Sequence, residues 1–207
     1  MRQKLYAAFG ITAALVLLTH SGRAWGGSEK KGLNVLAFNY STASESTLRG
    51  AEVETSRILA MSGIQLRWIQ CAAIVRPALP LACQSEARSA QIRVRILDKS
   101  AGGVFHDGIF GFATHPIFAT VYYESALLLA QRSTDSASSV STILGCLIAH
   151  EMGHLLLGAN QHTASGLMQA QWDIGQIKRA MMGTLLFTPE QSRMMLRNVD
   201  GRGTSRD

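Results

Sequence analysis

The sequence contains few charged residues and very few cysteines and prolines. Of its 207 residues, 16% are charged, 4 are proline and 3 are cysteine. It has no dense run of lysine and arginine and no interleaving of basic with aromatic residues, so we expect no nucleic-acid partner. Hydrophobic residues make up 47% of the chain, which is enough for the core of one globular domain.

The first residues have the layout of a secretory signal peptide. Two basic residues precede an apolar run at residues 5–18, and the small residues Gly22 and Ala24 follow at the positions that determine cleavage. The run is short for a membrane span. We therefore expect residues 1–24 to be removed and the protein to be secreted or periplasmic, without stable membrane insertion. An uncleaved membrane anchor is the alternative.

The three cysteines divide into a pair and a single residue. Cys71 and Cys83 flank a short loop with two prolines, and in an exported protein such a pair usually forms a disulfide. Cys146 lies in an apolar helical run, where we expect a buried free thiol. Because no cysteine precedes Cys71, we expect no lipid-modified N-terminal cysteine.

Local patterns predict strands and helices in alternation. Apolar and alternating runs predict four strands, at residues 33–41, 64–71, 91–97 and 117–125. Helical periodicity predicts three helices, at residues 43–61, 139–157 and 188–199. Capping boxes are expected to begin the first helix at Thr42 and the last at Thr188. We expect an α+β or α/β sandwich, with one domain over residues 25–199 and a loose tail at 200–207.

The predicted helix at residues 139–157 contains the sequence HEMGH. His150 and His154 are four residues apart, so one turn places both on one face, where they can bind Zn²⁺ at about 2.0–2.1 Å. Glu151 flanks that face, where a carboxylate can take a proton from metal-activated water and return it to a leaving amine. In an otherwise apolar helix such groups are costly unless something pairs with them. The motif predicts a zinc hydrolase; a chance match is the alternative.

A zinc hydrolase needs a third protein ligand, and His162 is the leading candidate. Eight residues of continuous helix would separate it from His154 by about 12 Å. The chain must therefore turn back, and Gly158 permits that turn. Five other residues are weaker candidates, because their spacing is unsuitable or another role explains them: Glu190, Asp173, Cys146, His106 and His115.

The run from His150 through Gly158 and His162 to Met168 resembles the metzincin clan of zinc metalloproteases. The resemblance implies one catalytic zinc ion held by the three histidines, with Glu151 as general base. In that clan the methionine lies in a turn beneath the metal, and the resemblance implies this role for Met168. The usual pattern places two residues before the glycine and two after it, whereas this sequence has three and three. The helix must run one residue longer, and the return loop must bulge by one.

The resemblance also implies an architecture and an activity. The fold would be an α/β sandwich with one twisted, mostly parallel sheet, a long active-site helix, the methionine turn and a C-terminal helix. A peptide would lie extended along an edge strand, for which residues 117–125 are the candidate. Residues 169–174, with Trp172, would form a pocket wall. We therefore expect a monomeric, exported zinc metalloendopeptidase that acts on peptides or proteins.

Two other classes of protein remain as alternatives. A non-catalytic exported protein could keep the fold and bind metal or peptide without turnover, but such a module has no need of Glu151. An intramembrane protease would use the apolar residues 142–158 as a membrane helix. No other long apolar segment follows the predicted signal peptide, so a membrane bundle cannot be assembled.

Overall fold

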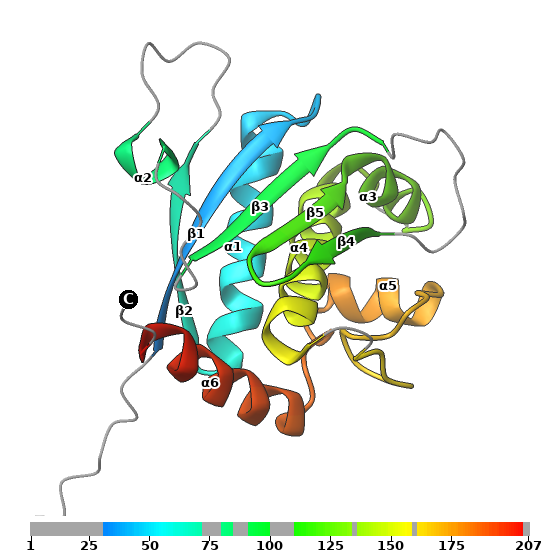
Figure 1. The fold of residues 1–207 in the computed structure, drawn as a ribbon. Coiled ribbons are helices and arrows are strands. Elements are labelled where there is room, and N and C mark those ends of the chain that lie inside the picture. Colours follow the sequence, from blue (N-terminus) through cyan, green and yellow to red (C-terminus); the bar gives the residue numbers. More distant parts are fainter. Residues whose placement is uncertain are drawn as a thin grey trace, which may run out of the picture.

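The structure is a computed structural model that describes residues 31–71, 80–84, 91–99, 110–133, 136–158 and 161–204. The predicted signal peptide lies outside these residues. The described part of the chain forms one sheet whose inner face is covered by two long helices (Figure 1).

Five strands make up this sheet. They are β1 (Lys31–Tyr40), β2 (Ile64–Gln70), β3 (Gln91–Leu97), β4 (Gly111–Thr114) and β5 (Phe118–Tyr122). Their order is β2-β1-β3-β5-β4, and neighbouring strands are parallel except for the antiparallel pair of β4 and β5. The predicted mostly parallel sheet is therefore confirmed.

Six helices lie in the described residues. They are α1 (Glu45–Met61), α2 (Leu81–Gln84), α3 (Tyr123–Ala130), α4 (Ser136–Leu157), α5 (Ile174–Met181) and α6 (Pro189–Thr204). Figure 1 shows α1 and α4 side by side behind the sheet and α6 passing below the end of α4. Val35, Val94 and Val121 point from their strands into the core beneath these helices and are fully buried.

The predicted strand at residues 117–125 is wrong in its second half and in its position. Phe118–Tyr122 forms β5, but Tyr123 begins α3, and β5 lies between β3 and β4. The edge strand on this side of the sheet is instead β4, inside a glycine-rich segment for which no strand was predicted. Gly111 allows the close approach of β4 to β5, because a Cβ there would lie 2.0 Å from the Thr120 carbonyl oxygen.

The predicted start of α1 is also wrong. Ser44, not Thr42, caps the helix, and its hydroxyl oxygen accepts a hydrogen bond from the Thr47 N–H at 3.1 Å. Thr42 instead donates both its backbone N–H and its hydroxyl to Asp98, at 2.7 and 2.9 Å. Thr42 thus bonds to a distant part of the chain, although the local sequence pattern predicted it as the helix cap.

Two helical segments exceed the prediction. α6 continues through Gly201 to Thr204, so the predicted helix end at Val199 is wrong, and so is the loose tail as far as Thr204. α5 lies where an irregular segment was expected. It begins at a capping box in which Asp173 accepts from backbone N–H groups and the Gln176 side chain accepts from the Asp173 N–H.

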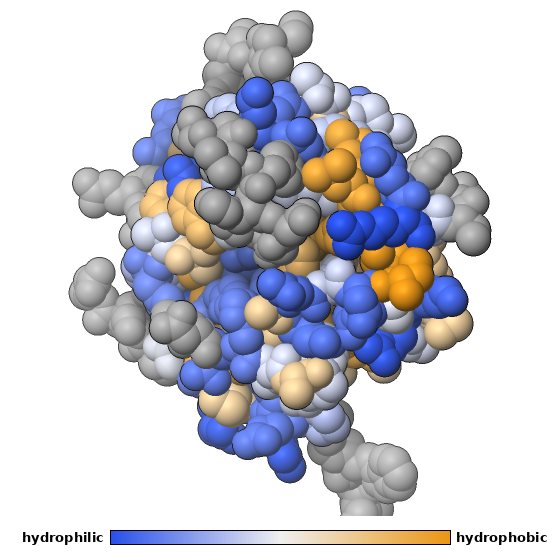
Figure 2. Space-filling view, turned by 90° about the vertical axis from the view of Figure 1, so that its right-hand side faces the viewer, coloured by the Kyte–Doolittle hydropathy of each residue, from blue (hydrophilic) through white to orange (hydrophobic). Residues whose placement is uncertain are grey.

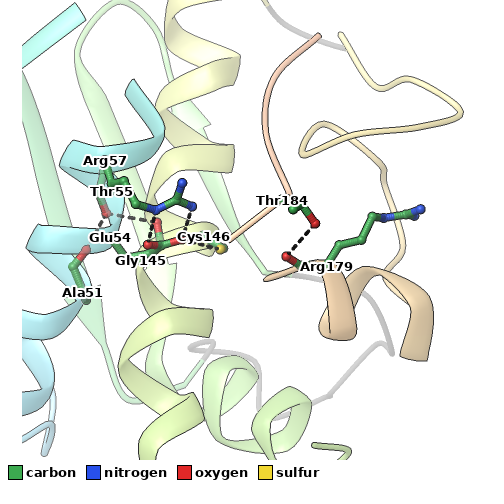
Figure 3. A network of polar contacts seen from close by, with 8 residues as sticks. All are labelled: Ala51, Glu54, Thr55, Arg57, Gly145, Cys146, Arg179 and Thr184. Atoms are coloured by element: carbon green, nitrogen blue, oxygen red, sulfur yellow. Dashed lines mark hydrogen bonds and ion pairs between the residues drawn. The ribbon is translucent and has the colours of Figure 1, made fainter. Parts of the chain in front are cut away.

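Gly145 brings the backbones of α1 and α4 together where the two helices cross (Figure 3). A Cβ at Gly145 would lie 2.7 Å from the Ala51 carbonyl oxygen. The buried Thr55 hydroxyl lies 2.8 Å from the Ala51 oxygen and 2.9 Å from the Gly145 oxygen. The close approach at Gly145 and the hydrogen bonds of Thr55 therefore set the distance between α4 and α1 at this crossing.

A polar cluster beside the crossing joins the same two helices (Figure 3). Glu54 accepts two hydrogen bonds of 2.7 Å from Arg57, and the Cys146 thiol donates to Glu54 at 3.7 Å. Cys146 is buried and free, as predicted. Burial raises the pKa of its thiol well above the usual value, which disfavours the thiolate form that binds metals.

The predicted pair Cys71 and Cys83 forms a disulfide that ties the end of β2 to α2. Both cysteines pack with the fully buried Leu36 in a small cluster of their own. This cluster is separate from the main core, which lies between the sheet and the helices. The disulfide thus ties α2 to the end of β2 outside the main core.

α4 is the helix among the described residues that is long and apolar enough to cross a membrane, over Ser139–Leu157. However, 78% of its apolar window is buried inside the protein. Its hydrophobicity is explained by its place in the core.

Candidate metal centre

The second half of α4 carries the three titratable groups of the HEMGH sequence. His150 and Glu151 are 2% and 3% exposed, and His154 is half-buried. Burial lowers the pKa of His150 to about 3 and that of His154 to about 4. Burial also raises the pKa of Glu151 to about 8. Both imidazoles are thus held in the neutral form that metal ligands require.

A hydrogen bond to the backbone orients His150. Its Nδ1 lies 2.8 Å from the Leu167 carbonyl oxygen. A carbonyl oxygen only accepts, so Nδ1 carries the proton and Nε2 carries the free lone pair. This Nε2 lies 3.2 Å from the Nε2 of His154. The two ligand atoms therefore face the same point, with the ring of His150 fixed from behind as in histidine metal sites.

His162 reaches the same point from the loop after α4. Gly158 ends the helix with a φ of +107°, which glycine adopts without steric cost. The ring centroid of His162 lies 5.5 Å from that of His150 and 4.7 Å from that of His154. Ligand atoms of the three histidines all lie within 4.8 Å of one another. His162 therefore lies beside the pair on α4.

This set of donors fits a zinc ion. Two nitrogen ligands about 2.1 Å from a tetrahedral ion lie about 3.4 Å apart, close to the 3.2 Å between His150 and His154. Three neutral imidazoles leave a fourth position for water or substrate, as in catalytic zinc sites. His162 is exposed, so the site is reached from solvent. No other such group of three or more His, Cys, Asp or Glu occurs among the described residues.

The turn that contains Met168 packs directly on the HEMGH segment. Met168 is fully buried, and a Cβ at Gly153 would lie 2.5 Å from its Sδ and 2.8 Å from Phe187 Cε1. Gly153 therefore permits the contact between the turn and the backbone of α4. The Leu167 N–H donates to the Leu186 oxygen at 2.9 Å, which holds the turn in place.

Two aromatic rings surround His150. The Phe110 ring lies edge-on to it at 5.3 Å between centroids, and Trp172 lies at 6.2 Å. Phe110 and Trp172 also contact each other at 4.9 Å, and both are buried. Trp172 was expected in a pocket wall. Phe110 was not expected, because a lone apolar residue in a glycine-rich segment has no distinguishing spacing.

The weaker candidate ligands lie elsewhere. Asp173 caps α5 through two backbone N–H groups. Glu190 is exposed in the first turn of α6, and His115 is exposed in the turn between β4 and β5. The thiol of Cys146 is directed to α1, as described above. His106 lies outside the described residues.

Known proteins were similar in structure and not in sequence. A scan against protein-family models finds no match, and a search of curated proteins finds none. An archaemetzincin from Methanopyrus kandleri aligns with a TM-score of 0.55 at 12% identity, covering 83% of this chain and 98% of that one. A zinc-dependent peptidase from Methanocorpusculum labreanum aligns with a TM-score of 0.53 at 15% identity, covering 78% and 99%. At these identities the likeness concerns the fold, and this chain shares its fold with both proteins.

Proposed function

We propose that the chain is an exported zinc-dependent endopeptidase of metzincin type. The observation that carries the proposal is the convergence of His150, His154 and His162 on one point, with Glu151 next to His150 in the chain. The fold shared with an archaemetzincin and a zinc-dependent peptidase supports it. The three histidines hold one zinc ion in this proposal, and Met168 forms the apolar floor of the site.

Each residue then has a defined part in peptide-bond hydrolysis. A bound zinc ion would polarise the scissile carbonyl and lower the pKa of a water molecule. Glu151 acts as general base. The positive charge of a bound zinc ion would lower the pKa that burial raises, so that the ionised carboxylate takes the proton of the attacking water and delivers it to the leaving amine. The carbonyl of Leu167 keeps the His150 ring in its ligating orientation. The rings of Phe110 and Trp172 exclude water from the inner side of that histidine.

We propose that β4 binds the substrate by strand addition. It is the edge strand on the side where α4 and α5 lie (Figure 1). The Tyr122 N–H donates to the Phe110 oxygen, so Phe110 and Tyr122 form a hydrogen-bonded pair. Such pairs alternate with non-hydrogen-bonded pairs in an antiparallel ladder. The backbone N–H and C=O groups of Gly111 and Ala113 therefore point away from β5. An extended peptide can pair with those groups.

The surface on this side suits a substrate of mixed character. Figure 2 shows separate hydrophobic patches among hydrophilic residues on the side that carries β4, α3 and α5. Phe112 of β4 and Ile174 of α5 are 43% and 49% exposed. Such exposed apolar side chains beside a strand edge provide contacts for alternate side chains of an extended peptide.

Export is supported by chemistry elsewhere in the chain. The disulfide between Cys71 and Cys83 belongs to an oxidising compartment such as the periplasm or the extracellular space. We propose that residues 1–24 direct the chain there and are then cleaved. N-terminal sequencing of the exported protein tests this: a mature chain that begins at Trp25 supports it, and one that begins at Met1 contradicts it.

Glu151→Gln tests the assigned chemistry. The substitution keeps the three histidines, so the zinc content should equal that of the unsubstituted protein. Cleavage of an unfolded protein substrate should fall by about 10²-fold or more, the usual contribution of a positioned base. Glu190→Gln changes an exposed carboxylate on α6 and should leave both quantities unchanged. Cleavage by Glu151→Gln at the unsubstituted rate would show that the base is another residue.

The same assay separates the non-catalytic alternative. An unsubstituted protein that binds zinc but cleaves no unfolded protein or peptide library would be a metal-binding or peptide-binding protein that has kept the fold.

A further inference from the structure

The C-terminal helix α6 contacts both ends of the loop that carries His162. α6 packs on α4 (Figure 1). Gln191, Asn198 and Arg202 follow one another in steps of seven and four residues, which places them along one face of the helix. Each of these side chains donates hydrogen bonds to another segment of the chain.

At the start of the loop, two of these side chains bond to the end of α4. Asn198 Nδ2 donates to the Leu156 oxygen at 2.7 Å, and Arg202 Nη2 donates to the Leu155 oxygen at 2.6 Å. The last carbonyl groups of a helix have no partner within it, and a cation is favourable there. Arg202 Nη1 also donates to the Pro116 oxygen at 2.9 Å. Arg202 thus ties the end of α4 to the turn between β4 and β5.

At the far end of the loop, Gln191 bonds to the residue that follows His162. Its Nε2 donates to the Thr163 hydroxyl oxygen at 3.3 Å. The Thr163 N–H donates to the Met168 oxygen, and its hydroxyl donates to the Ser165 oxygen at 2.8 Å. Gln191 Oε1 accepts from the Thr188 N–H at 2.9 Å. One side chain thus completes the capping box of α6 and anchors the methionine turn.

We infer that Gln191, Asn198 and Arg202 are positioning residues that set His162 against the pair on α4. The inference rests on the zinc site proposed above. The segments between His154 and His162 each contain one residue more than the usual pattern. Each added residue brings backbone freedom that must be restricted. α6 restricts it by fixing the carbonyls before Gly158 and the residue after His162.

The experiment uses variants at opposite ends of the loop. Asn198→Ala removes a donor to the end of α4. Gln191→Glu keeps an oxygen that can cap Thr188 but cannot donate to Thr163, whose own hydrogen is already engaged. Equilibrium zinc affinity is measured by competition with a chromophoric chelator. We expect each variant to bind zinc about 10-fold more weakly, the lower end of the effect of partners that orient ligands. Arg197→Ala, at an exposed position of α6, is the matched control and should not change the affinity.

The His162→Ala background separates positioning from general stabilisation. If α6 acts through His162, then Asn198→Ala should cause no further loss of zinc affinity once His162 is removed, because the two effects are coupled. The inference would be overturned if Asn198→Ala lowered zinc affinity equally with and without His162, or if it did not lower zinc affinity in the protein that retains His162. Unfolding curves of the metal-free variants identify any variant that fails to fold. If one of Asn198→Ala and Gln191→Glu does not fold, the other is used to test the inference. Absence of zinc binding by the unsubstituted protein would instead overturn the zinc site itself.

Discussion

Gly145→Ala would place a methyl group between α1 and α4 at their crossing. The new carbon would lie 2.7 Å from the Ala51 oxygen and 2.7 Å from Glu54 Cβ. Neither atom can rotate away, because one belongs to the backbone and the other is the first atom of its side chain. α1 must therefore shift, and the Thr55 hydroxyl, 2.9 Å from the Gly145 oxygen, loses part of its contact.

The net change in stability combines one stabilising contribution with two destabilising ones. Alanine favours a helix over glycine by about 1 kcal/mol. Overpacking of a close-packed core costs about 1–3 kcal/mol, and a lost buried hydrogen bond costs about 1 kcal/mol more. The substitution should therefore lower the free energy of unfolding by about 1–3 kcal/mol. For a chain of this size, that corresponds to about 2–4 °C in Tm for each kcal/mol.

Denaturant unfolding of the metal-free protein measures this change. Gly201→Ala is the control, since Gly201 lies in α6 and a Cβ added there would have nothing within 4 Å. The control should gain up to about 1 kcal/mol from helix propensity alone. A Gly145→Ala protein that gains stability as the control does would refute the account of the crossing.

Two further predictions concern the site. Gly153→Ala would place a methyl group 2.5 Å from Met168 Sδ, so unfolding curves should show a loss of about 1–3 kcal/mol; unchanged stability would argue against the close packing of the turn on α4. In the metal-free protein, the pKa of Glu151 is about 8 when folded and 4.5 when unfolded, so ionisation favours the unfolded chain as pH rises through this window. His150 and His154, with pKa values lowered to about 3 and 4, have the opposite effect below pH 6.5. In urea unfolding, the free energy of unfolding of Glu151→Gln should rise relative to that of the unsubstituted protein between pH 5 and 8. A difference between the two proteins that is constant with pH would contradict the raised pKa of Glu151.

The parts of the fold that depend on local sequence were predictable. The alternation in β3 arises because its isoleucine and valine side chains enter the core while Arg93 and Arg95 lie on the other face. The capping box of α6 depends only on Thr188 and Gln191, which lie next to each other in the folded chain. The spacing of the histidines in α4 follows from the geometry of one helical turn.

Most elements that were predicted wrongly depend on contacts between distant segments of the chain. β4 has four residues and exists because Gly111 fits against β5, which no local pattern reveals. α3 begins without a side-chain cap at Tyr122. By contrast, the start of α5 has a local signal in the sequence, since Asp173 and Gln176 have the spacing of a capping box. The position of His162 could not be derived from its spacing, because α6 donates the bonds that fix the loop.

The zinc content of the purified protein and of His162→Ala, prepared side by side, tests the central claim most directly. Elemental analysis after dialysis should find about one zinc ion per unsubstituted chain, as a site with three protein ligands requires. The variant should retain far less, because its third ligand is gone. A folded protein without zinc, or a variant that retains as much zinc as the unsubstituted chain, would contradict the assignment of the three histidines.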